Sequence, residues 1–98
     1  MDLNKIPEKY QEDIKIAANL LKNEGCKAVY LFGSMVTGKI HANSDIDIGI
    51  TGLPPKKFFG VYAYLDRSLS NKVDLVDFDF QKDFYTLLNS LGEVVEIG

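Results

Sequence analysis

Two aspartates, Asp45 and Asp47, are separated by one isoleucine at the start of an alternating apolar run. In a β-strand, residues i and i+2 point to the same face, so these carboxylates would lie about 6.5–7 Å apart along one side of the strand. Carboxylates at this spacing suit hard divalent cations such as Mg²⁺, which also bind phosphate oxygens. The pair predicts a metal–phosphate site, whereas a D-x-D pattern standing alone is more often a solvated strand face.

Gly33 and Ser34 end an earlier apolar run, and ten residues separate Ser34 from Asp45. Glycine lets a phosphate approach the backbone closely, because it carries no side chain. The serine hydroxyl can donate a hydrogen bond, and residues 34–36 can form a helical turn whose N–H groups attract anions. The two residues therefore predict a phosphate contact beside the acidic pair.

A third carboxylate usually completes a site of this kind, and the run from Lys72 to Phe78 offers Asp74 and Asp77. These two lie on opposite faces of the predicted strand, so only one of them can join the first pair. Clustered carboxylates disfavour one another's ionisation, so the group requires a cation. The residues alone leave both candidates open.

Helical and strand patterns alternate along the chain, which is typical of an α/β fold with helices packed on a sheet. Helices are predicted over 7–24, 55–68 and 81–90, and strands over 27–32, 45–51 and 72–78. The alternation of the middle strand puts three isoleucines on its core face. Val94, Val95 and Ile97 fit either a last short strand or a packed tail. We expect a mixed sheet of three to four strands.

Composition describes an ordinary globular chain of 98 residues, 46% hydrophobic and 26% charged, which suits one domain over 1–98. The net charge of −3 argues against general binding of nucleic acid. The single Cys26 cannot form an internal disulfide and is expected to be a buried apolar residue. The first ten residues lack the apolar region of a leader, and no run is long enough to span a membrane, so we expect a cytoplasmic protein.

The combined motif resembles that of the nucleotidyltransferase superfamily of DNA polymerase beta and kanamycin nucleotidyltransferase, and most closely its minimal, MNT-type members. It consists of Gly33-Ser34, Gly38, Ser44-Asp45-Ile46-Asp47-Ile48 and the later run VDLVD. The resemblance implies the small nucleotidyltransferase fold. It implies that Gly33, Ser34 and Ser44 bind the nucleotide, that Asp45 and Asp47 bind two Mg²⁺ ions, and that Asp74 matches the third acid, with Asp77 as the fallback.

The resemblance also implies a reaction, the transfer of AMP from ATP to a hydroxyl with release of pyrophosphate. Minimal members often pair with a HEPN-domain toxin and act as its antitoxin by adenylylating a tyrosine, so a HEPN partner is expected, and self-association is also possible for so small a chain. Other D-x-D enzymes, such as haloacid-dehalogenase-type phosphatases and many glycosyltransferases, are disfavoured because there the acidic pair follows its apolar strand.

The loop after Gly33-Ser34 departs from the pattern of the family. Family members often carry arginines just after Gly-Ser, where this chain has Met35 and Thr37; Lys39 could substitute, although a solvated lysine is the simpler interpretation. His41, in the same loop, is interpreted as a surface residue.

The competing function is a binding module that neutralises its partner by contact, without catalysis. Loss of neutralisation on replacing Asp45 and Asp47 would separate the two.

Overall fold

The helices and strands expected from the sequence are present in a computed structural model, which describes residues 5–98. Residues 1–4, part of the segment in which no leader was expected, lie outside the described residues. The elements in chain order are α1 (Glu8–Asn23), β1 (Ala28–Phe32), α2 (Ser34–Thr37), β2 (Ile46–Thr51), η2 (Pro55–Lys57), α3 (Phe58–Ser68), β3 (Val73–Asp77), α4 (Lys82–Ser90) and β4 (Val94–Glu96).

The predicted boundaries differ from these by one or two residues, and one helix is divided. Residues 55–57 form a 3₁₀ turn in place of the first turn of an α-helix. Proline lacks a backbone N–H, and the N–H of Lys57 donates to the carbonyl of Pro54 over three residues at 2.9 Å. Asp45, expected to begin the middle strand, lies immediately before β2.

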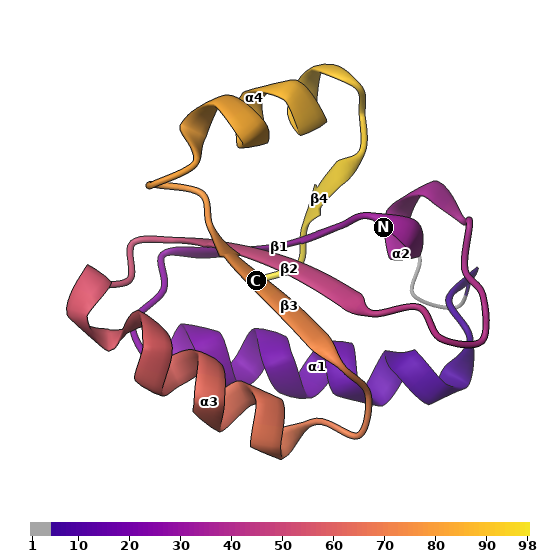
Figure 1. Cartoon of the computed structure of the whole chain (residues 1–98), viewed down its shortest axis with the longest axis horizontal. Coiled ribbons are helices and arrows are strands. Elements are labelled where there is room, and N and C mark those ends of the chain that lie inside the picture. The colour runs from indigo at the N-terminus through magenta and orange to yellow at the C-terminus, as the bar shows by residue number, and fades with distance from the viewer. Residues whose placement is uncertain (1–4) are drawn as a thin grey trace.

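The sheet has four strands in the order β3-β2-β1-β4, so the fourth strand proposed as an alternative exists. β1 is antiparallel to both β2 and β4, whereas β2 and β3 are parallel. Parallel neighbours need a crossover connection, and α3 supplies it (Figure 1). The predicted α/β fold with a mixed sheet is therefore confirmed.

One face of the sheet is covered by α1 and α3, which lie side by side beneath it in Figure 1. The side chains of Ile46, Ile48 and Ile50 point to this face and are fully buried. They meet the apolar stripe of α1, which consists of Tyr10, Ile14, Ala17 and Leu21. Burial of this face fixes the parity of β2, because a shift of one residue would bury the aspartates instead.

The opposite face is covered in part by α4 (Figure 1). A smaller cluster lies there, in which Phe32, Phe78 and Leu88 are buried. Gly49 of β2 belongs to this face, and a Cβ at its position would overlap the ring of Phe78. Asp47 of β2 shares this face with the aromatic cluster.

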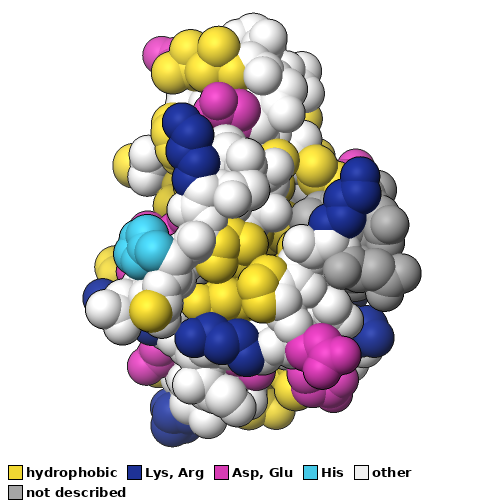
Figure 2. All heavy atoms as spheres, turned by 90° about the vertical axis from the view of Figure 1, so that its right-hand side faces the viewer, with side chains coloured by type: hydrophobic (Ala, Val, Ile, Leu, Met, Phe, Trp, Pro, Cys, Tyr) yellow, Lys and Arg dark blue, Asp and Glu magenta, His cyan; other side chains and the backbone are white. Residues whose placement is uncertain are grey.

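The side of the molecule that carries α2 shows hydrophobic side chains at its centre, and its lysines are scattered around them (Figure 2). A hollow of about 420 Å³ beside α2 is lined by apolar residues that include Ile6, Met35 and Ile40. Among the described residues on this face, the lysines form no continuous basic patch of the kind that nucleic-acid binding needs. Among residues 5–98, none of the helices has the length and apolar character needed to cross a bilayer.

Candidate active site

The predicted site residues come together at one end of the sheet. Phe32 is the last residue of β1 and pairs with Asp47, so Gly33 and Ser34 leave β1 beside the start of β2. Because β3 runs parallel to β2, its first residues lie at the same end. This topology brings Gly33, Ser34, Asp45, Asp47 and Asp74 to the same end of the sheet.

Of the two candidates for the third carboxylate, Asp74 is the one that lies beside Asp47. The two are direct partners in the register of β2 and β3, and neighbouring strands lie about 4.8 Å apart. Asp77 instead pairs with Ile50, at the far end of the strand. Its Oδ1 accepts the backbone N–H of Asp79 at 2.9 Å, so this carboxylate stabilises the turn after β3.

Gly33 lies directly against the carboxylate of Asp47. Its φ of 72° is in the left-handed region, and a Cβ built on it would overlap Oδ2 of Asp47. Its carbonyl accepts the N–H groups of Val36 and Thr37, both at 3.0 Å, which closes the helical turn predicted after Gly-Ser. Glycine is thus required here both by the backbone conformation and by the carboxylate.

Ser44 is buried, and its hydroxyl oxygen accepts the backbone N–H of His41 at 2.8 Å. The N–H of Ser44 donates in return to the carbonyl of His41 at 3.0 Å. This exchange fixes the end of the loop that delivers Asp45. His41 itself is exposed, as expected for a surface residue.

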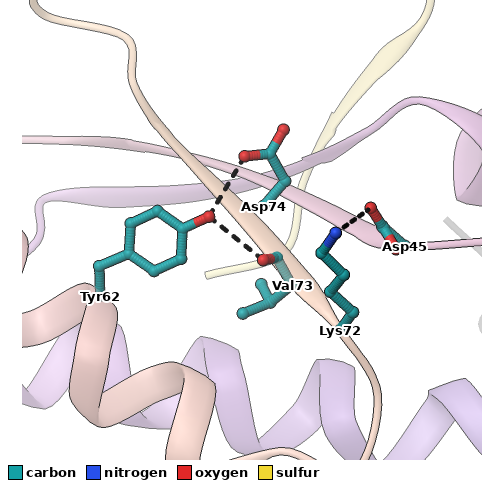
Figure 3. A network of polar contacts seen from close by, with 5 residues as sticks. All are labelled: Asp45, Tyr62, Lys72, Val73 and Asp74. Atoms are coloured by element: carbon teal, nitrogen blue, oxygen red, sulfur yellow. Dashed lines mark hydrogen bonds and ion pairs between the residues drawn. The ribbon is translucent and has the colours of Figure 1, made fainter.

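The two outer carboxylates already have protein donors (Figure 3). The hydroxyl of Tyr62 on α3 lies 3.3 Å from Oδ1 of Asp74 and 3.2 Å from the carbonyl oxygen of Val73. Nζ of Lys72 lies 3.9 Å from Oδ2 of Asp45, as an exposed ion pair. Burial, together with the negative charge of Asp74, raises the pKa of Tyr62, so its hydroxyl keeps the proton that it donates.

Asp47 lies between the other two acids. Burial, together with the negative charges of Asp74 and Asp45, raises the pKa of its carboxyl group to about 6. The protein has therefore gathered negative charge here at a cost to the ionised state. A bound cation would remove that cost.

The donor set suits a hard cation, since all three side chains offer carboxylate oxygens. In the described part of the chain, however, no three His, Cys, Asp or Glu side chains converge closely enough to hold a metal ion. Asp45 would have to turn from Lys72 and Asp74 from Tyr62 to share ions with Asp47. The chemistry of the donor set therefore fits Mg²⁺, and the strand register holds Asp47 beside Asp74.

The carboxylates lie on an open surface. The nearest hollow, of about 320 Å³, is bounded by Asp45, Ser44, Lys72 and Lys9. Hollows of about 340 and 270 Å³ lie elsewhere, at the start of α4 and beside Phe59. A small-molecule substrate held only by this chain would therefore remain largely accessible, which leaves room for an acceptor carried by a second molecule.

Two residues that support the site were missed or underrated in the sequence. Asp13 is buried, and its carboxylate accepts the N–H groups of Ser70 and Asn71 at 3.1 and 2.7 Å, fixing the loop that begins β3. The position of an aspartate within the apolar stripe of α1 was the signal that a buried carboxylate accepts hydrogen bonds there. Nothing in the helix of Tyr62 predicts its contact with Asp74, which depends on how α3 packs against β3.

Comparisons with known proteins identify the family. A family model described as "Polymerase beta, Nucleotidyltransferase" matches residues 14–94. A chain of a toxin–antitoxin complex solved with AMP-PNP is 34% identical over 69% of this chain and 57% of its own length, with a TM-score of 0.55. A chain of the MntA–HepT toxin–antitoxin complex is 28% identical over 70% of this chain and 56% of its own, with a TM-score of 0.52.

A mutant of an MntA toxin–antitoxin complex is matched more extensively, at 26% identity over 86% of this chain and 69% of that one, with a TM-score of 0.63. The chain spans a little more than half the length of the first of these structures. A comparison with curated protein sequences returned no match. The match over 14–94, together with the fold, shows that the chain belongs to the polymerase beta nucleotidyltransferase family.

Proposed function

We propose that this chain transfers AMP from ATP to a hydroxyl group of a partner protein in a Mg²⁺-dependent reaction. The observation that carries the proposal is the pairing of Asp47 with Asp74 across β2 and β3, next to Asp45 and directly against Gly33. A glycine that leaves room beside a carboxylate cluster is what a triphosphate bound through metal ions requires. The family match supports the same class of reaction.

In this proposal, Asp45, Asp47 and Asp74 would hold two Mg²⁺ ions, and Asp74 would be the ligand nearest the acceptor. The ions would neutralise phosphate charge and favour the ionised acceptor hydroxyl. Gly33, Ser34 and Ser44 bind and orient the nucleotide. The acceptor oxygen attacks the α-phosphorus, the bond from that phosphorus to the bridging oxygen breaks, and pyrophosphate leaves. The carboxylate of Asp74 takes the hydroxyl proton.

The acceptor proposed here is a tyrosine of a HEPN-type toxin, with this chain acting as the antitoxin. The similar structures come from toxin–antitoxin complexes, one of them with the ATP analogue AMP-PNP. The open carboxylate surface also favours an acceptor brought by another protein. Large apolar side chains exposed on α3 and around α4 offer surface for such a partner: Phe59, Phe80, Leu87 and Leu91.

The test is to incubate the chain with ATP, Mg²⁺ and the HEPN-type protein encoded beside it, and to measure the intact mass of that protein. The proposal predicts a mass gain of one or more AMP units with wild type and with Asp66→Asn, which removes an exposed acid from α3. Asp45→Asn/Asp47→Asn should give no gain. An unchanged partner mass with wild-type protein would contradict the proposal.

A second candidate is the binding module that neutralises a partner by contact. The observation in its favour is that the outer carboxylates are held by Lys72 and Tyr62 and do not converge with Asp47. The same Asp45→Asn/Asp47→Asn variant separates the candidates in cells that express the toxin. Full protection by the variant would favour contact, whereas loss of protection with retained binding would favour catalysis.

A further inference from the structure

The turn after Gly33 offers no cation for the triphosphate. Where family members often carry arginines, Met35 is buried, and Thr37 is neutral. Two Mg²⁺ ions shared by three carboxylates leave too little positive charge to balance a nucleoside triphosphate. Another cation beside the carboxylates would therefore strengthen nucleotide binding.

Lys72 is placed beside the carboxylates by strand register. Ile46 pairs with Val73 and Asp47 with Asp74, so the residues that precede these strands, Asp45 and Lys72, are neighbours. The N–H of Ile46 donates to the carbonyl of Lys72 at 2.9 Å, which extends the ladder to this position. Lys72, which directly precedes β3, and Asp74 are two residues apart in this extended ladder, so their side chains point to the same face. Figure 3 shows the lysine reaching across to Asp45.

The backbone at Lys72 is held in place by hydrogen bonds from the two residues that precede it. The two residues before it donate their N–H groups to the buried carboxylate of Asp13, and the side chain of Asn71 donates to the carbonyl of Lys9 at 2.7 Å. The side chain of Lys72 is nevertheless 77% exposed. Lys72 thus combines a fixed backbone with an exposed ammonium group, so its side chain can exchange a carboxylate partner for a phosphate.

We propose that Lys72 binds the phosphates of the nucleotide, and that its pairing with Asp45 is the resting arrangement that metal ions displace. This inference rests on the proposed function, because it assigns a residue to the same nucleotide site. When a metal ion occupies Asp45, it repels the ammonium group, which then turns to the phosphate oxygens. Lys39, the alternative considered from the sequence, is exposed in the loop after Gly38 and is not assigned this role.

The proposal predicts changes of opposite sign for two ligands. Without nucleotide, Lys72 competes with the metal for Asp45, so Lys72→Met should bind Mn²⁺, a substitute for Mg²⁺, about two- to threefold more tightly. With Mg²⁺ present, the same variant should bind AMP-PNP roughly tenfold more weakly, because a charge-assisted contact is lost. A purely structural role would weaken both.

The experiment measures Mn²⁺ binding by electron paramagnetic resonance and AMP-PNP binding by calorimetry for wild type, Lys72→Met, Lys72→Arg and Lys39→Met. Lys72→Arg should retain AMP-PNP binding within about threefold, and Lys39→Met should match wild type. Circular dichroism checks folding, and Lys72→Gln replaces the methionine variant if that one does not fold.

Three outcomes would overturn the assignment. Equal AMP-PNP affinity in wild type and Lys72→Met would exclude the phosphate contact while leaving the proposed reaction intact. A loss in Lys39→Met alone would transfer the role to Lys39. If wild-type protein binds no AMP-PNP with Mg²⁺, the proposed function fails and this inference fails with it.

Discussion

The backbone of Gly33 lies against the carboxylate of Asp47, so closely that a Cβ on the glycine would overlap Oδ2 of the aspartate. This contact joins the end of β1 to the start of β2 across an antiparallel pair. Gly33, the candidate phosphate contact, and Asp47, the central acid of the cluster, therefore lie in direct contact. A substrate that reaches one of them also reaches the other.

Replacing Gly33 should therefore cost more than its backbone conformation alone. Gly38 has a similar positive φ of 82° but has nothing within 4 Å of a built Cβ, so it provides a matched control. Gly38→Ala should lower the free energy of unfolding by about 1 kcal/mol, through backbone strain. Gly33→Ala should cost more and should also abolish AMP transfer. Equal stabilities, with activity retained in Gly33→Ala, would contradict the close approach.

The central acid should make the metal-free chain sensitive to pH. The pKa of Asp47 is raised from its ordinary 3.8 to about 6, chiefly by burial and then by Asp74 and Asp45. A raised pKa means that the folded state binds this proton more tightly than the unfolded state does. The stabilisation from that proton is complete below about pH 4 and is lost as the pH rises through about 6.

Denaturant unfolding in EDTA measures this effect. Relative to Asp47→Asn, the wild-type free energy of unfolding should fall by about 1 kcal/mol between pH 4 and pH 7, an amount reduced for solvent screening because the carboxylate is only half-buried. The exposed-site control Asp66→Asn should follow wild type. Parallel curves of the free energy of unfolding against pH for wild type and Asp47→Asn would show that ionisation of Asp47 does not destabilise the folded chain.

Asp13 should stabilise the chain strongly, although it is remote from the chemistry. Asp13→Ala would leave the part-buried N–H groups of Ser70 and Asn71 without their acceptor. The loss should be about 2–4 kcal/mol in the free energy of unfolding. Glu12→Ala, at the exposed neighbouring position, should change it by less than about 0.5 kcal/mol. Thermal unfolding monitored by circular dichroism compares the two, and similar losses would rule out the anchoring role.

Cys26 should be chemically silent in the folded protein. It is 4% exposed, and burial is the main cause that raises the pKa of its thiol to about 11. The reactive thiolate is therefore scarce at neutral pH. Mass spectrometry after iodoacetamide treatment should show no label in native buffer and full labelling in denaturant. Rapid native labelling would indicate that the loop after α1 opens.

Local patterns were sufficient to predict three of the four strands and the helices except the 3₁₀ turn before α3, whereas β4 was only one of two alternatives. Alternating Ile46, Ile48 and Ile50 can bury only one face of their strand, so Asp47 between them had to face the other way. The single helical turn after Gly33 followed from the glycine and the polar loop. The division of residues 55–68 depended on two prolines, whose effect on a first helical turn is local but was underestimated.

Relations across strands were beyond the sequence. Parity put Asp74 and Asp77 on opposite faces, yet only the parallel register of β2 and β3 pairs Asp47 with Asp74. The same register brings Lys72 to Asp45, and the crossover helix brings Tyr62 to Asp74. These contacts join residues distant in sequence, whose pairing is set by the whole fold. The metal-binding and nucleotide-binding roles of the predicted residues stay predictions.

The identity of the third carboxylate tests the account most directly. The measurement is the rate of label transfer from α-labelled ATP to the partner protein, with Mg²⁺, for wild type, Asp74→Asn and Asp77→Asn. Asp74→Asn should lose activity on the order of 100-fold or more, while its folding is unchanged. Asp77→Asn, whose side chain only supports a turn, should stay near wild type. Activity retained in Asp74→Asn and lost in Asp77→Asn would contradict the site described here.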